Sequence, residues 1–250
     1  MTEILLINPN TTRSITDLVL RTARGFAAKG TRLRATTGAF GPRYIASRVG
    51  YAIAGHAAVD ALARDRGRKD AVVLACFGDP GLAALKEIAD VPVIGMADAS
   101  ILQACAMGDR FSIVTGGERW KSMLEEFVAG HGLTSRLASV RTVAPTGADI
   151  ARNPKAAMAM LAEGCQACAR EDGADVVILG GAGLAGLAAR LRRSVDVPLL
   201  DGVACAISMA EGLAGQSPRK AVLGAQSRPA PVDSIGLSPA LKKTLLASQA

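Results

Sequence analysis

Two stretches of the chain, residues 70–95 and 175–202, repeat one unit. The first reads DAVVLACFGDPGLAALKEIADVPVIG and the second reads DVVILGGAGLAGLAARLRRSVDVPLLDG. Most matched positions keep an offset of 105 residues, and at one of them Cys76 in the first stretch corresponds to Gly181 in the second. A repeat this long contains a whole strand, loop and helix. It therefore predicts two similar lobes related by a pseudo-twofold axis rather than a solenoid of short repeats.

Strand–loop–helix units follow one another along the whole chain. Residues 3–26 and 111–128 each contain a short apolar strand, a polar turn and a helix with one apolar face. Second strands are predicted near residues 32–37 and 136–141, each running into a Thr-Gly turn. This order predicts an α/β fold with parallel sheets in two pseudo-twofold-related lobes.

We expect lobe 1 to comprise residues 1–98 plus about 206–250 and lobe 2 to comprise residues 99–205, with the active-site cleft between them. The last segment is expected to hold a helix over 206–213, a short strand over 220–225 and a short helix within 236–247.

The composition favours some partners over others. Half of the residues are apolar but only 3% are aromatic, which suits buried parallel sheets better than a surface that stacks nucleic-acid bases. The net charge of +7 is spread along the chain, and its densest basic run, RDRGRK at 64–69, is predicted to be a solvated helix end and loop. We therefore expect a bias toward small anions and no nucleic-acid partner.

The sequence also bears on location. The start, MTEILLINPN, is typical of neither a signal peptide nor an anchor, and the uncharged run over 176–189 is shorter than the ~18 residues of a membrane span. The five cysteines are odd in number and lack the spacing of a secreted disulfide framework. Free thiols, a cytoplasmic location and no membrane association are the expectation.

Four turns should meet in the cleft, because ligands of parallel sheets bind beyond the carboxyl ends of the strands. The turns are NPNTT after the first strand, CFGDPG after residue 75, TGGE after residue 114 and GGAGLAG after residue 179. Helix N-termini gathered there form an anion site without Lys or Arg, and they are expected to lower the pKa of the Cys76 thiol.

Other motifs point to no further chemistry. No turn matches a dinucleotide or Walker fingerprint, and Cys165 and Cys168 form a CxxC inside a helical pattern, so we expect core thiols there and no metal site. Cys105 and Cys205 are likewise predicted to be core. His131 is predicted to cap a helix end at the surface, whereas His56, near the start of a helix, is a candidate for either a cleft or a structural role.

These turns together resemble the aspartate/glutamate/hydantoin racemase superfamily. The similarity is carried by NPNTT, ACFGDPG, VILGGAGLAGL and VPLLDG, covers residues 1 to about 225, and is closest to the hydantoin and allantoin racemase branch. The resemblance implies two flavodoxin-like lobes and an isomerase that needs no cofactor. It also implies one cysteine from each lobe, so that one removes the proton next to a carbonyl and the other returns a proton to the opposite face.

Carried over by residue, the resemblance assigns catalysis to Cys76 and places Gly181 where the second cysteine is missing. The substrate-binding positions that it implies are Asn8, Asn10, Phe77, Gly78, Thr115, Gly116, Gly117 and Ala182. Arg43, Tyr44, Arg48 and His56 are further candidates for specificity contacts.

The missing second cysteine leaves several activities open. A single thiol can serve a racemase in which a water above Gly181 supplies the other proton, a decarboxylase, or a cis–trans isomerase of a small diacid. The remaining alternative is a non-catalytic protein that binds small anions. In each case the expected partner is a small anionic or imide compound, and the apolar composition favours a homo-oligomer.

Overall fold

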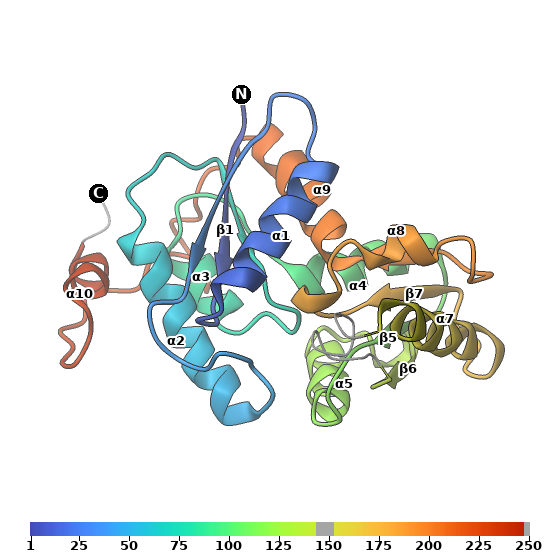
Figure 1. Cartoon of the computed structure of the whole chain (residues 1–250). Coiled ribbons are helices and arrows are strands. Elements are labelled where there is room, and N and C mark those ends of the chain that lie inside the picture. Colours follow the sequence, from blue (N-terminus) through green and yellow to red (C-terminus); the bar gives the residue numbers. More distant parts are fainter. Residues whose placement is uncertain (144–152, 248–250) are drawn as a thin grey trace.

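The computed structural model describes residues 1–143 and 153–247 and contains two parallel sheets of four strands each (Figure 1). The first sheet comprises β1 (Glu3–Asn8), β2 (Arg32–Thr37), β3 (Ala71–Leu74) and β4 (Val93–Gly95), in the order β2-β1-β3-β4. The second comprises β5 (Phe111–Val114), β6 (Leu137–Arg141), β7 (Val176–Leu179) and β8 (Leu199–Asp201), in the order β6-β5-β7-β8. The shared order confirms the prediction of two similar α/β halves.

Helices flank both sheets. The helices are α1 (Arg13–Phe26), α2 (Arg48–Arg64), α3 (Leu82–Ile88), α4 (Met96–Met107), α5 (Trp120–Gly130), α7 (Pro154–Arg170), α8 (Leu187–Leu191), α9 (Gly202–Gly215) and α10 (Pro239–Leu246). The central strands β3 and β7 are apolar and fully buried, which is what a sheet covered on both faces requires.

The two helices that join the halves cross over. Helix α4 follows β4 of the first sheet but also packs against β5, β7 and β8 of the second, and α9 follows β8 but packs against β3 and β4 of the first. These two helices also pack against each other. The helix that follows each sheet therefore packs against the other sheet. This exchange of helices fixes the two sheets relative to one another.

The repeat seen in the sequence is also a repeat in backbone conformation. Gly81 and Gly186 begin α3 and α8, and both adopt the left-handed conformation, with φ of 82° and 84°. A side chain at either position would be strained, so the glycine recurs because the turn needs it.

The C-terminal segment departs from one prediction. The expected strand over 220–225 is absent, and these residues form turns and bends whose Val222 and Leu223 are exposed. Lys220 and Ala221 share a cavity wall with Val93 and Ile94 of the edge strand β4, but the segment does not join that sheet. The predicted helices on either side are present as α9 and α10, and α10 packs against α2.

Three further sequence predictions concern the basic run, a Thr-Gly turn and membrane-spanning helices. The run at 64–69 is a helix end and loop in which Arg64 pairs with Asp60 and Lys69 with Asp65. The predicted Thr-Gly turn at 146–147 lies outside the described residues. No helix in 1–143 or 153–247 combines the length and apolar character needed to cross a membrane.

Candidate active site

A cavity of about 340 Å³ lies where the carboxyl ends of the strands of both sheets meet. Its walls come from both halves of the chain, as expected for open parallel sheets. The lining residues are Asn10, Ile15, Tyr44, Ile45, Cys76, Phe77, Thr115, Gly116, Gly117, Trp120, Gly180, Gly181, Ala182, Gly183 and Leu184. Eight of the ten residues proposed from the sequence are therefore brought together, and Asn8 and Gly78 are not among them.

Cys76 lies two residues beyond the end of β3 and lines this pocket. It is 8% exposed, and burial raises the pKa of its thiol, with a further contribution from the negative charge of Asp79. The prediction that helix N-termini lower this pKa is therefore wrong. The physical reason is local: α3 begins only at Leu82, and among the described residues no cation offsets the burial of Cys76.

Asp79 is the residue in the Cys76 turn whose role the sequence did not reveal. It is 2% exposed and adopts a left-handed φ of 55°, a conformation that aspartate tolerates better than most residues. Its Oδ1 accepts from the Ala97 amide at 3.0 Å and its Oδ2 from the Asp98 amide at 2.7 Å. It therefore caps α4 and ties the turn that contains Cys76 to that helix. Burial raises the pKa of this carboxyl to about 7.

Gly181 lies at the corresponding position of the second half, but its backbone differs from that of Cys76. Its φ is +146°, a value that side-chain-bearing residues rarely adopt, whereas Cys76 has no positive φ. A Cβ built at Gly181 would lie 3.7 Å from Leu184 and 3.9 Å from Thr115 Oγ1, both ordinary contacts. The two halves thus diverge here in main-chain conformation as well as in side chain.

Asn8 supports the pocket wall without lining it. It is 1% exposed, and its Nδ2 donates to Asn10 Oδ1 at 3.0 Å and to Thr16 Oγ1 at 2.9 Å. Asn10 Oδ1 also accepts from the Thr12 amide at 2.8 Å. Asn8 therefore holds the turn that presents Asn10 to the cavity. The direct substrate contact expected for Asn8 is not supported by this position.

Trp120 joins the two halves across the pocket. It lies on the buried face of α5 and is 7% exposed. Its Nε1 donates to the Ile45 carbonyl at 3.0 Å, in the loop between β2 and α2. Gly78, which does not line the cavity, would place a Cβ 2.6 Å from the Trp120 ring, so its lack of a side chain makes room for the indole. Tyr51 donates to the Gly78 carbonyl at 2.8 Å.

The structure places the four candidate specificity residues differently with respect to the pocket. Tyr44 lines the pocket, whereas Arg43, Arg48 and His56 do not. His56 lies in the middle of α2, not near its start, and its exposed ring packs edge-on against Phe40 at 4.8 Å. The predicted cap at His131 is confirmed: it ends α5, and its Nδ1 lies 2.8 Å from the Phe127 carbonyl.

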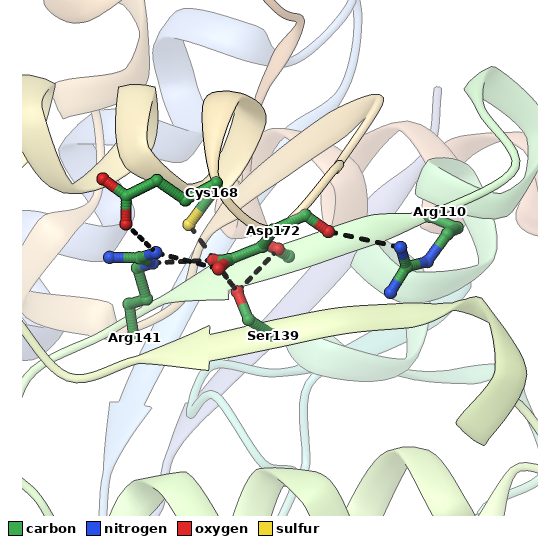
Figure 2. A network of polar contacts seen from close by, with 7 residues as sticks. Arg110, Ser139, Arg141, Cys168 and Asp172 are labelled. Carbon is green, nitrogen blue, oxygen red and sulfur yellow. Dashed lines mark hydrogen bonds and ion pairs between the residues drawn. The ribbon is translucent and has the colours of Figure 1, made fainter.

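The other cysteines lie away from the cavity. Cys165, Cys168 and Cys205 are buried and Cys105 is partly buried, and all five cysteines are free thiols. In Figure 2, Arg141 and Ser139 on β6 reach Asp172 at the end of α7, with Cys168 above them. These contacts anchor α7 to β6 and use no pocket residue. The described ranges contain no cluster of His, Cys, Asp and Glu that could hold a metal.

Known proteins resemble the chain over most of its length. Residues 4–210 match the Asp/Glu/hydantoin racemase family. A hydantoin racemase from a Pseudomonas species is 35% identical over 210 residues, which cover 84% of each chain. The structure of allantoin racemase from Pseudomonas fluorescens has a TM-score of 0.90 and 32% identity, covering 94% of this chain and 100% of its own. Allantoin racemase from Klebsiella pneumoniae has a TM-score of 0.90 and 31% identity, covering 96% and 99%.

Proposed function

The chain belongs to the Asp/Glu/hydantoin racemase family and is an isomerase of the racemase type, and we propose that Cys76 is its acid–base group. In this proposal the thiolate removes the proton from a carbon next to an imide carbonyl. The observation that carries the proposal is the position of Cys76. It is a thiol at the end of a buried strand, in the wall of a cavity formed by both halves of a racemase fold.

The lining of the cavity favours an imide ring over an amino-acid carboxylate. Among the described residues that line it, none is Lys or Arg, so a carboxylate would lack a cationic partner. Ile15, Phe77, Trp120 and Leu184 instead offer apolar surface. We therefore propose a neutral hydantoin-like ring with an apolar substituent as the substrate. The hydantoin racemases among the relatives support this choice.

Removal of the proton leaves an enolate whose oxygen carries the new negative charge. Preorganised donors near that oxygen lower the barrier because they do not need to reorient. We assign this role to the hydroxyl of Thr115 and the backbone of Gly116 and Gly117. These residues line the cavity and follow β5, in the half that does not contain Cys76. Because burial raises the pKa of Cys76, the reactive thiolate is a minor species at neutral pH.

A decarboxylase is the second candidate, and Gly181 favours it. With one thiol, the enzyme could protonate an enolate on one face only, after loss of carbon dioxide rather than after loss of a proton. Release of carbon dioxide from a disubstituted malonate, without hydantoin inversion, would support this candidate over the racemase.

The racemase proposal is tested with a hydantoin of one configuration. Pure (S)- and (R)-benzylhydantoin are incubated separately with the protein in D₂O, and chiral chromatography and mass spectrometry follow inversion and deuterium uptake. We expect inversion and deuterium uptake above the uncatalysed rate. Cys76→Ala should abolish inversion, and it should abolish deuterium uptake by the enantiomer whose proton faces Cys76. Full activity in Cys76→Ala would remove the thiol from the mechanism.

Two expectations about the protein in the cell remain proposals. A cytoplasmic location is supported by the five free thiols, which a reducing compartment preserves. A homo-oligomer is supported by apolar side chains left exposed on α2, Val49 and Ile53, and light scattering of the purified protein tests it.

A further inference from the structure

The pocket contains a thiol from the first half and a bare glycine at the matching position of the second. A racemase must handle a proton on each face of its substrate carbon, so a second proton-carrying group is needed on the side of Gly181. The lining side chains with an exchangeable proton are those of Asn10, Tyr44, Cys76, Thr115 and Trp120.

Most of these groups are unsuited to the role. The indole N–H of Trp120 is held by the Ile45 carbonyl at 3.0 Å. The side chain of Asn10 is an amide, which is not an acid near neutral pH, and its oxygen already accepts from Asn8 and Thr12. The hydroxyl of Thr115 is an aliphatic alcohol, a far weaker acid than a phenol. Tyr44 remains, since a phenol has an ordinary pKa near 10.

The loop between β2 and α2 carries Tyr44 across to the second half. Its hydroxyl lies 3.9 Å from the position that a Cβ would take at Gly117. Gly117 is two residues from Thr115, whose Oγ1 lies 3.9 Å from the Cβ position of Gly181. The phenol of Tyr44 therefore lies beside the turn that follows β5, which also borders Gly181, and both residues line the same cavity. Its backbone comes from the half that supplies Cys76.

The residues on both sides of Tyr44 are held in place. The Arg43 carbonyl accepts from Thr12 Oγ1 at 2.7 Å, and the Ile45 carbonyl accepts from the Trp120 indole. One anchor comes from the first half and the other from the second. Tyr44 lines the cavity and is 64% exposed, so the proton of its hydroxyl can exchange with water between turnovers.

We propose that Tyr44 is the second acid–base group, a role that rests on the proposed racemase function. In one direction the Cys76 thiolate takes the proton from the carbon, forming an S–H bond, and the Tyr44 O–H bond breaks as its proton passes to the other face. The products are a thiol, a phenolate and the inverted substrate. Water then returns a proton to the phenolate and accepts one from the thiol. In the opposite direction the phenolate is the base and the thiol is the acid.

The electrostatics of the pocket suit this assignment. Partial burial raises the pKa of Tyr44, and the negative charge of a Cys76 thiolate raises it further. An ionised Cys76 therefore favours the protonated form of Tyr44, which is the form that donates a proton in the forward reaction.

Tyr44→Phe removes the hydroxyl and keeps the ring. In D₂O we expect inversion of both benzylhydantoin enantiomers to fall by about 10²–10⁴-fold. The enantiomer whose proton faces Cys76 should still take up deuterium with retention, and the other should not. Thermal unfolding checks that the variant is folded. The matched control is Tyr51→Phe at the other tyrosine, which does not line the cavity, and its ratio of deuterium uptake to inversion should equal that of the wild type.

Each other result has a defined meaning. Wild-type inversion in Tyr44→Phe would overturn the role of Tyr44 and leave the racemase proposal standing. An equal fall of deuterium uptake for both enantiomers would show that Tyr44 has a merely structural role. It would overturn the proposal that Tyr44 is an acid–base group. A wild-type protein that neither inverts nor labels either enantiomer would overturn the racemase proposal and the role of Tyr44 together.

Discussion

Gly181→Cys restores the thiol that the repeat leads one to expect, and the structure predicts that it destabilises the protein. The added Cβ meets Leu184 and Thr115 at 3.7–3.9 Å, so steric overlap is not the problem. The problem is the backbone, since φ of +146° is a conformation that a side chain disfavours. The turn must either hold that strain or move.

The size of the effect follows from these two observations. Holding a residue other than glycine in a sparsely populated region costs about 1–3 kcal/mol. The new side chain buries little more than one methylene, which offsets this by about 0.8 kcal/mol at most. Starting from the middle of the strain range, about 2 kcal/mol, a net loss of about 1–2 kcal/mol remains. For a chain of this size it lowers the Tm by roughly 2–8 °C.

Differential scanning calorimetry measures the change, with Gly183→Cys as the control. Gly183 lies in the same turn, has no left-handed φ, and a Cβ there would meet nothing within 4 Å. Its substitution should alter stability by less than about 0.5 kcal/mol. If Gly181→Cys were as stable as the control, the strain argument would be refuted. In the Tyr44→Phe background we expect Gly181→Cys to restore inversion, because the new thiol faces the side that lost its proton donor.

Three further predictions concern catalysis, pH and packing. Deuterium uptake through Cys76 should rise about tenfold per pH unit from neutral pH to pH 9 without a plateau, because the raised thiol pKa keeps the thiolate scarce, and a pH–rate profile tests this. Asp79 has a folded pKa raised to about 7, so its contribution to stability is present below pH ~4 and lost as pH rises through ~7. Denaturant titrations should show this trend as a difference between wild type and Asp79→Asn, and a pH-independent difference would contradict it. Arg141→Lys should lower stability by about 1–2 kcal/mol, since lysine cannot reproduce the two-pronged contact with Asp172 in Figure 2, and urea unfolding measures the loss.

The repeat in the sequence was sufficient to predict the architecture. Strands buried on both faces, each followed by a Gly-rich turn, indicated two parallel sheets, and the sheets share one strand order. It also predicted which turns meet, because the carboxyl ends of parallel strands lie at one edge. The isolated apolar run at 220–225 is not a strand; it had no repeat partner, and its Val222 and Leu223 are exposed.

Side-chain environment was harder to predict than position. Cys76 lies where expected, but the sequence does not show that five residues separate it from the start of α3 or that a buried carboxylate lies in the same turn. Asn8 lies in the turn that the sequence predicted. The direction of its side chain, however, depends on a hydrogen bond to Thr16, a residue of α1 that belongs to no recognisable motif. Tyr44 and Ile45 belong to a loop whose course is set by contacts with Trp120, and no local pattern reveals such contacts.

The bond between Trp120 and the Ile45 carbonyl has a practical consequence. The chain contains a single tryptophan, and its indole is part of the cavity wall. Its emission therefore comes from one place, between the two halves and beside the proposed reacting groups. A compound that enters the cavity, or a movement that separates the halves, changes the surroundings of that one ring. The protein thus carries its own optical reporter of occupancy, with no label to attach and no second indole to obscure the signal.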